Sequence, residues 1–252
     1  MPTQPGTNIE HTQSARRGQI GVGDLEPDAA PQEIVAWTYR VFERVALVAS
    51  FQVESIVLIH MAVALGIRPR VVTLDTGRLP AETLAYIEDV SRDFELDLQI
   101  ERPDPLAVEE MVSTHGRDLF LRSVELRHAC CEVRKVRPLA AALSGYDAWI
   151  TGLRRDQSST RLDTPITELD RAHGGLLKVA PLAAWSASEV WSYVEANQLR
   201  VHPLYAQNYT SIGCAPCTRA TRPGEDQRAG RWWWEMGAVK ECGIHPTKGP
   251  GR

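Results

Sequence analysis

The most constraining feature of this 252-residue sequence is an alternation of short apolar segments with segments of helical periodicity. Apolar runs at 45–49, 70–74 and 148–151 predict strands, and between them apolar residues recur at the spacing of a helix. Strands that alternate with helices in this way form a mainly parallel sheet with helices on both faces. We therefore expect a doubly wound α/β fold.

Further segments continue this pattern as far as about residue 203. Ser186 and Glu189 have the spacing of a capping box, which predicts the start of the last helix. Beyond residue 203 the sequence has no long period and is rich in Gly, Pro and Arg. Helices are predicted at 31–44, 55–66, 80–94, 131–143 and 185–199, and two more strands at 96–100 and 176–182.

These patterns divide the chain into three parts. Residues 1–30 are polar, rich in Gly and Pro, and lack the apolar core of a signal peptide, so we expect a flexible leader. Residues 31–205 are expected to form an α/β nucleotide-binding domain. Residues 206–252 are expected to form a C-terminal arm, which is locally basic because it contains seven Lys and Arg residues against four Asp and Glu residues.

Overall charge and hydropathy argue against several kinds of partner. A net charge of −4 and a pI of about 6.0 give no indication of a surface for nucleic acid or anionic membranes. No segment approaches the roughly 20 apolar residues of a membrane-spanning helix. We therefore expect a soluble, cytoplasmic protein that binds neither nucleic acid nor membranes.

Polar loops follow three of the predicted strands. In an open parallel sheet, ligands bind outside the carboxyl ends of the strands, where such loops converge. The loop at 50–55 also precedes a helix, whose unpaired N–H groups and dipole attract a phosphate. This loop has no glycine, which favours a nucleotide with one phosphate over a pyrophosphate. The candidate ligands in it are Ser50, Gln52 and Ser55, and the other two loops lie at 74–80 and 151–161.

Four of the five cysteines form two close pairs about 80 residues apart, Cys130 with Cys131 and Cys214 with Cys217. In a cytoplasmic protein, paired cysteines are more often metal ligands or redox groups than structural disulfides. The first pair is expected to open the helix at 131–143. Vicinal cysteines fit the C-x-x-C knuckles of a zinc site poorly, whereas a [4Fe–4S] cluster tolerates irregular spacing. The spacing favours a cluster, but leaves structural zinc and buried free thiols open.

The fifth cysteine, Cys242, has no cysteine close to it in the sequence. Lys240 and His245 lie nearby and, as positive neighbours, would favour its thiolate form. Spacing alone leaves two interpretations open, a nucleophile carried by the arm or a thiol exposed on a tail.

Seven motifs occur in this order along the sequence: SFQVES, LDTGR, CCEVRK, TGLRRDQS, SIGCAPCTR, GRWWWE and KECGIH. Taken together and in order, they resemble those of the assimilatory adenylyl-sulfate (APS) reductase family. This family is the iron–sulfur branch of the phosphoadenylyl-sulfate (PAPS) reductase superfamily. The resemblance covers residues 31–246 and implies an adenine nucleotide alpha hydrolase-like fold with a C-terminal catalytic arm.

The resemblance also implies a reaction. Members of that family reduce APS to sulfite and AMP with thioredoxin or a similar dithiol, in sulfate assimilation and cysteine biosynthesis. By resemblance, Cys242 is the catalytic nucleophile and the protein is a homo-oligomer. The ligands of a [4Fe–4S] cluster would be Cys130, Cys131, Cys214 and Cys217.

Substrate-binding residues are implied in the same way. By resemblance, Lys135, Arg228, Arg231 and His245 surround the sulfate or phosphate group. Lys135 follows Cys131 by about one helical turn, so the cluster and the substrate pocket would be adjacent. The residues assigned to the phosphate or ribose are Arg154 and Arg155, and those at the nucleotide end are Asp75 and Gly77.

Three alternative functions remain open at this point. The enzyme could prefer the 3′-phosphorylated substrate PAPS, because a few basic side chains near the ribose decide that preference. A zinc-stabilised nucleotide-binding module without reductase activity would make Cys242 dispensable. An ATP pyrophosphatase of the related loop class is disfavoured by the absence of glycine from the loop at 50–55.

Overall fold

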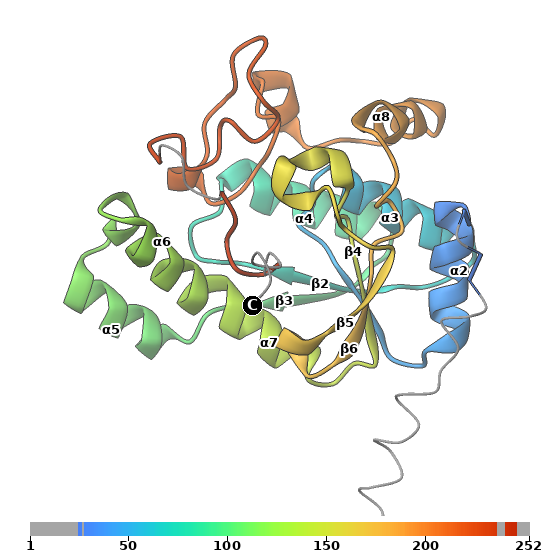
Figure 1. Ribbon diagram of the computed structural model, residues 1–252, viewed down its shortest axis with the longest axis horizontal. Coiled ribbons are helices and arrows are strands. Elements are labelled where there is room, and N and C mark those ends of the chain that lie inside the picture. Colours follow the sequence, from blue (N-terminus) through green and yellow to red (C-terminus); the bar gives the residue numbers. More distant parts are fainter. Residues whose placement is uncertain (1–24, 27, 236–239, 246–252) are drawn as a thin grey trace, which may run out of the picture.

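The structure, a computed structural model, describes residues 25, 26, 28–235 and 240–245. Most of the predicted leader, residues 1–24 and 27, therefore lies outside the described residues. At the centre is a six-stranded sheet with the order β3-β2-β1-β4-β6-β5, parallel except for β5 (Figure 1). The strands are β1 (Val45–Val48), β2 (Arg70–Leu74), β3 (Asp97–Glu101), β4 (Ala148–Thr151), β5 (Thr167–Asp170) and β6 (Leu176–Val179).

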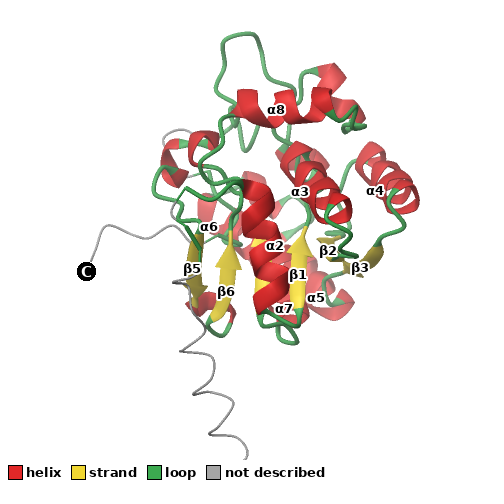
Figure 2. Cartoon of the chain, turned by 90° about the vertical axis from the view of Figure 1, so that its right-hand side faces the viewer, coloured by secondary structure: helices red, strands yellow, loops and turns green. Residues whose placement is uncertain are grey.

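Helices cover both faces of this sheet, which confirms the predicted doubly wound α/β fold. Successive strand residues point to opposite faces, so Leu47 packs in the core beneath α2, α3, α4 and α8, whereas Ala46 packs with Leu139 of α7. Figure 2 shows α2 crossing in front of the strands. The helices of the first face are α2 (Pro31–Val41), α3 (Val53–Ala64), α4 (Ala81–Asp93) and α8 (Ala187–Ala196); α7 (Arg137–Leu143) lies on the other.

The helical region before β4 differs from its prediction. Helix α5 (Pro105–His115) is followed by α6 (Val124–Cys131), a π-helical turn (Glu132–Val136) and then α7. The first cysteine pair thus ends α6 instead of opening a helix. The Ser123 side chain accepts a hydrogen bond from Leu126 N and caps α6 seven residues before the first of the two cysteines, so the helix begins earlier than apolar spacing indicated. π-Helical turns are rare in proteins, and those that do occur are frequently found at functional sites.

One strand was not predicted from the sequence. Strand β5 consists of Thr167, Glu168, Leu169 and Asp170, and pairs antiparallel with β6 at the edge of the sheet. It has no apolar run, because an edge strand buries little of either face. The capping box of α8 is confirmed, since Ser186 Oγ accepts from Glu189 N at 3.2 Å and Ser186 N donates to the Glu189 carboxylate at 2.7 Å.

Among the described residues of the arm, the only helical segments are short 3₁₀ turns, as the loss of periodicity after residue 203 indicated. Figure 1 shows it, coloured orange to red, packed against the rest of the molecule. Within the described part of the chain, no helix is long and apolar enough to cross a membrane. The 3₁₀ turns of the described residues lie at Leu119–Leu121, Arg155–Gln157, Ser159–Arg161, Arg171–His173, Pro203–Gln207 and Ala215–Cys217.

The strand order places a ligand crevice between β1 and β4. The chain passes from β1 to β2 and β3 on one side, and returns to β4 on the other side of β1. Where the loops after two neighbouring parallel strands turn in opposite directions, a crevice opens at the carboxyl ends of these strands. The loops after β1 and β4 begin at Ala49 and Gly152, so these two loops are expected to flank the binding site.

A buried ion pair ties these two loops together. Arg154 Nη2 lies 3.0 Å from Glu54 Oε1, and the side chains are 1% and 8% exposed. Removing one partner of a buried pair leaves the other charge without compensation, which costs about 3–5 kcal/mol.

We therefore expect Arg154→Met to lower the free energy of unfolding by about 3–5 kcal/mol, as measured by chemical denaturation. Arg155→Met is the matched control, because the neighbouring arginine is exposed and its Nε donates only to the carbonyl of Thr164. Equal stability losses in both variants would contradict a structural role specific to Arg154.

Candidate active site

A cavity of about 190 Å³ lies at the carboxyl ends of β1 and β4, where the strand order places a ligand crevice. The loop after β1 contributes Ser50, Gln52 and Ser55, as predicted, and the loop after β4 contributes Gly152 and Leu153. The arm closes the other side. Eight of the twelve residues predicted to be catalytic or to bind substrate line this cavity: Ser50, Gln52, Ser55, Lys135, Arg228, Arg231, Cys242 and His245.

The loop after β1 is fixed by its own side chains and by the arm. Ser50 N donates to Ser55 Oγ at 3.1 Å, and Gln52 Nε2 donates to Ser50 Oγ at 3.1 Å. Gln52 Oε1 accepts from Ile212 N of the arm at 2.7 Å. Phe51 has a φ of 55° and is fully buried, so packing holds a non-glycine residue in the left-handed conformation. The loop thereby makes a tight turn without glycine.

Basic side chains concentrate on the arm side of the cavity. Burial, together with the neighbouring Arg161, lowers the pKa of Arg228 to about 10. The Nε atom of Arg231 is buried and has no hydrogen-bond partner among the described residues. A Cβ atom at Gly213 would lie 2.3 Å from Nη2 of Arg231, so only glycine leaves room for this guanidinium. The site can therefore accept an anion.

Cys242 is half-buried and lines the same cavity as these cations. Lys135, from the π-helical turn, is one of the groups that interact electrostatically with Cys242. Burial lowers the pKa of Lys135, but the facing thiols of Cys214, Cys242 and Cys131 together outweigh burial and raise it. Lys135 therefore remains an ammonium and favours negative charge on the sulfur atoms around it.

His245 is not the positive neighbour of Cys242 that the sequence predicted. Burial, together with Lys178, Arg161 and Arg228, lowers the pKa of His245 well below its usual value, so the imidazole is neutral. Its ring stacks on Trp149 of β4 with centroids 5.7 Å apart, and its Nδ1 atom has no partner among the described residues. His245 can therefore offer a neutral hydrogen-bonding group to a ligand in the cavity.

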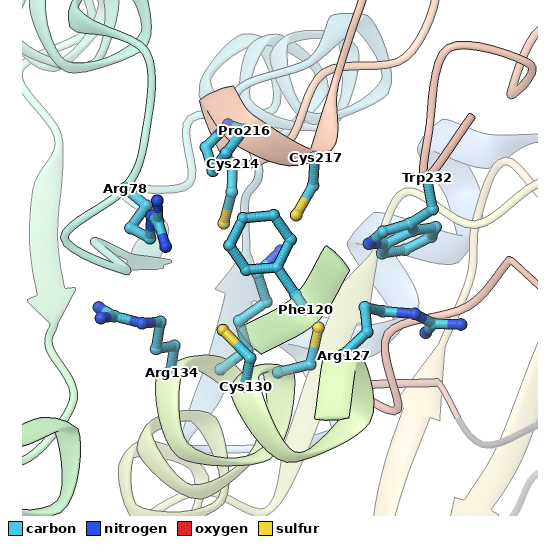
Figure 3. Close-up of a pocket in the computed structure, with 11 residues that line it drawn as sticks. Arg78, Phe120, Arg127, Cys130, Arg134, Cys214, Pro216, Cys217 and Trp232 are labelled. Carbon is cyan, nitrogen blue, oxygen red and sulfur yellow. The ribbon is translucent and has the colours of Figure 1, made fainter. Parts of the chain in front are cut away.

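A second cavity holds the four paired cysteines, all of them 6–8% exposed. Figure 3 shows the sulfur atoms of Cys214 and Cys217 pointing down from the arm towards that of Cys130 on α6. Lys135 and Trp232 line both this cavity and the one that contains Cys242. The two cavities are therefore neighbours that share a cation, Lys135.

Burial and nearby polar groups set the ionisation of these thiols. Burial raises the pKa of Cys131 to about 12 and that of Cys217 to about 11. Burial would raise the pKa of Cys214 too, but Lys135 and a 3.3 Å contact with the Thr76 hydroxyl outweigh it, and the pKa is lowered. Among the described residues, no three or more His, Cys, Asp or Glu side chains are arranged so that they could hold a single metal ion.

Two buried donors at this cavity lack acceptors. Arg134 Nε and Trp232 Nε1 are buried without hydrogen-bond partners among the described residues, and both side chains line the four-cysteine cavity (Figure 3). Leaving a buried donor unpaired costs about 1–3 kcal/mol. Both donors would be satisfied by thiolate or sulfide acceptors in the cavity, so the residues present fit an iron–sulfur cluster.

Four of the predicted substrate-binding residues do not line the cavity. Arg154 is buried in its pair with Glu54, and Arg155 is exposed. Asp75 accepts from Gly77 N at 3.0 Å and pairs with Arg102 at 3.1 Å. The structure does not bring Arg154, Arg155, Asp75 or Gly77 to the ligand site.

Of the charged residues at the cavity that were not predicted, two form an ion pair with each other. Arg161, in the loop after β4, and Glu241, next to Cys242, both line it and form a 2.8 Å ion pair. Glu241 lies inside one of the resembling motifs and Arg161 lies three residues after another, but neither has a sequence neighbour that indicates a partner 80 residues away. Only the fold brings this pair together.

Comparison with known proteins identifies the family to which this chain belongs. Residues 44–220 match the family described as phosphoadenosine phosphosulfate reductase domain, which is more than two thirds of the chain. The chain belongs to this family. It is a sulfur-group oxidoreductase by that membership, and its fold is the one that the motifs implied.

Named relatives of this family member cover most of its length. A protein from Allochromatium vinosum named adenosine 5'-phosphosulfate reductase is 46% identical over 86% of this chain and 85% of its own. One from Neisseria meningitidis with the same name is 43% identical over 78% of this chain and 81% of its own.

Among solved structures, a PAPS reductase from Candida auris in complex with phosphate covers 85% of this chain and 98% of its own length, with a TM-score of 0.65 and 22% identity. An FMN adenylyltransferase from Candida glabrata covers 94% and 84%, with a TM-score of 0.53 and 14% identity. These structures confirm the adenine nucleotide alpha hydrolase-like fold.

Proposed function

We propose that this member of the family is an APS reductase that uses a dithiol to convert adenylyl sulfate to sulfite and AMP. The observation that carries the proposal is that Cys242, Lys135, Arg228 and Arg231 line one cavity, and that Lys135 also lines the four-cysteine cavity. A thiol alone among cations suits attack on an anionic substrate, because the cations offset the repulsion between thiolate and sulfate. The names of the relatives agree with this activity.

The reaction balances with these residues. The Cys242 thiolate attacks the sulfur atom of the sulfate group, the bond from that sulfur to the phosphate oxygen breaks, and AMP leaves with the bonding electrons. Arg228 and Arg231 would hold the developing charge on the leaving phosphate. A dithiol then attacks Cys242 Sγ and releases sulfite, and its second thiol closes a disulfide, so the dithiol supplies both electrons.

We assign the four buried cysteines, Cys130, Cys131, Cys214 and Cys217, as the ligands of a [4Fe–4S] cluster. When bound, the cluster would contribute to the electrostatic environment of Lys135, which lines both cavities. Thr76, Arg134 and Trp232 would donate hydrogen bonds to the sulfur atoms there, as such outer donors do at other iron–sulfur sites.

Thioredoxin, or a protein with a similar dithiol, is our proposed reductant. We also propose a cytoplasmic location and a homo-oligomeric state.

The preference for APS over PAPS rests on the two cysteine pairs. No basic side chain beyond Lys135, Arg161, Arg228 and Arg231 lines the cavity in the described residues, and these are already needed for the phosphosulfate.

The test begins with protein purified without oxygen. We expect iron and sulfide in equal amounts, and a sulfonate adduct on the peptide that carries Cys242 after APS is added without a reductant. Turnover with thioredoxin should be faster with APS than with PAPS. Absence of iron together with absence of an adduct would overturn the reductase proposal, while iron with faster PAPS turnover would overturn only the substrate preference.

A further inference from the structure

The residue before the nucleophile is held unusually firmly for a surface arm. The Glu241 side chain is 8% exposed, and its carboxylate accepts from Arg161 Nε and Nη2, both at 2.8 Å. Thr160 Oγ1 donates to it at 3.1 Å and Arg228 Nη2 at 3.3 Å. A two-pronged arginine–carboxylate pair out of water is among the stronger polar contacts in proteins.

The carboxylate of Glu241 is an anion in this position. Burial would raise its pKa, but hydrogen bonding to Arg161 and the charges of Arg228 and Arg161 outweigh burial and lower it. The main chain of the same stretch is anchored separately. Arg127 donates to the Glu241 carbonyl, and Arg228 Nη2 donates to the Lys240 carbonyl at 2.6 Å. The side chain of Glu241 and its backbone are thus held by partly different groups.

The cations that hold Glu241 belong to the substrate cavity. Arg161 and Arg228 line it together with Glu241 and Cys242. Among the described residues, the wall of the substrate cavity carries four cations and two carboxylates. One of the two carboxylates, Glu54, is neutralised by Arg154, which does not line the cavity. Glu241 is therefore the carboxylate that occupies the cationic side of the cavity. The Arg161–Glu241 pair also lines a neighbouring cavity of about 120 Å³, so it forms part of the wall between them.

We propose that Glu241 is a positioning residue that acts as an internal substitute for the ligand anion. In the ligand-free enzyme its carboxylate binds Arg161 and Arg228 and holds Cys242 at the cavity. A phosphate or phosphosulfate group that enters requires the same guanidinium groups and displaces this carboxylate. This displacement releases the side-chain anchor beside Cys242, while the contact of Arg127 with the Glu241 carbonyl remains.

This inference rests on the proposed function for the identity of the ligand and makes a counter-intuitive prediction. When an internal group occupies the site in some of the molecules, the ligand can bind only the remaining molecules. The apparent affinity for the ligand then falls in proportion to the fraction of molecules whose site is free. Glu241→Gln retains the size of the side chain but removes the charge that competes with a phosphate. The variant should therefore bind AMP more tightly than the wild type, by about tenfold if the occupied state is favoured ten to one.

The experiment measures AMP binding by calorimetry on the anaerobically purified holoenzyme, and the alkylation rate of Cys242 by mass spectrometry of its peptide. In the wild type, AMP should increase the alkylation rate, because it frees Glu241. In Glu241→Gln, alkylation should already be fast without AMP. Glu225→Gln is the matched control, since Glu225 pairs with Arg219 in the same arm, at 2.8 Å, and does not line the cavity.

Unchanged or weaker AMP binding in Glu241→Gln would overturn the inference, because a carboxylate that assists the ligand or ignores it cannot compete with it. If that variant does not fold, the wild-type alkylation rate decides: no change with saturating AMP overturns the inference. A wild type that reduces APS but fails either test refutes only the role of Glu241. A wild type that neither binds AMP nor reduces APS refutes the proposed function.

Discussion

Cys242→Ser should lose sulfite formation by about a thousandfold or more, while retaining its iron and its affinity for AMP. A serine hydroxyl has nearly the same size as the thiol but is not ionised at neutral pH and cannot carry a sulfonate that a dithiol then reduces. The three measurements are sulfite release, iron content and AMP binding by calorimetry. No adduct should form on the peptide that contains residue 242.

Cys214→Ser provides the contrast for this prediction. Cys214 is buried in the four-cysteine cavity, and its sulfur atom contacts the Thr76 hydroxyl at 3.3 Å. That variant should lose both sulfite formation and iron, because a proposed cluster ligand is removed. If Cys242→Ser also lost its iron, or if it still produced sulfite at a comparable rate, Cys242 would not be the nucleophile.

The sheet and its helices could be predicted from the sequence because burial imposes a period on each element. Strands such as β1 and β4, buried on both faces, are continuous apolar runs. Strand β5 escaped prediction for the converse reason, since Leu169 is 64% exposed and the strand has only one partner.

The candidate site could be predicted only where a residue type is rare. The five cysteines stand out in any sequence, and the structure brings the two pairs to one cavity and Cys242 to the adjacent one. Arginines are common, and the sequence does not distinguish Arg154, which stabilises two loops, from Arg161, which faces the ligand site. Which charge faces which cavity depends on long-range packing. The same reasoning applies to His245, whose charge is removed by burial that no local pattern reveals.

Lys135→Met should lower the rate of sulfite formation about a hundred- to a thousandfold, because Lys135 is the cation that the nucleophile and the four-cysteine cavity share. Methionine retains much of the apolar side chain without the ammonium, so the loss isolates the charge. The variant should also bind AMP more weakly, since one of the four cations of the cavity is removed. Single-turnover adduct formation on Cys242, measured on holoenzyme with matched iron content, separates an effect on chemistry from an effect on cluster assembly.

Lys240→Met is the control that separates position in the sequence from position in space. Lys240 is two residues from Cys242 but lines neither cavity, whereas Lys135 is 107 positions away and lines both. Because electrostatic stabilisation of a thiolate falls with distance, Lys240→Met should change the adduct rate by no more than about threefold. Equal losses in the two variants would show that the sequence neighbour matters as much as the shared cation. A Lys135→Met enzyme with a normal adduct rate would leave the shared lysine without a catalytic role.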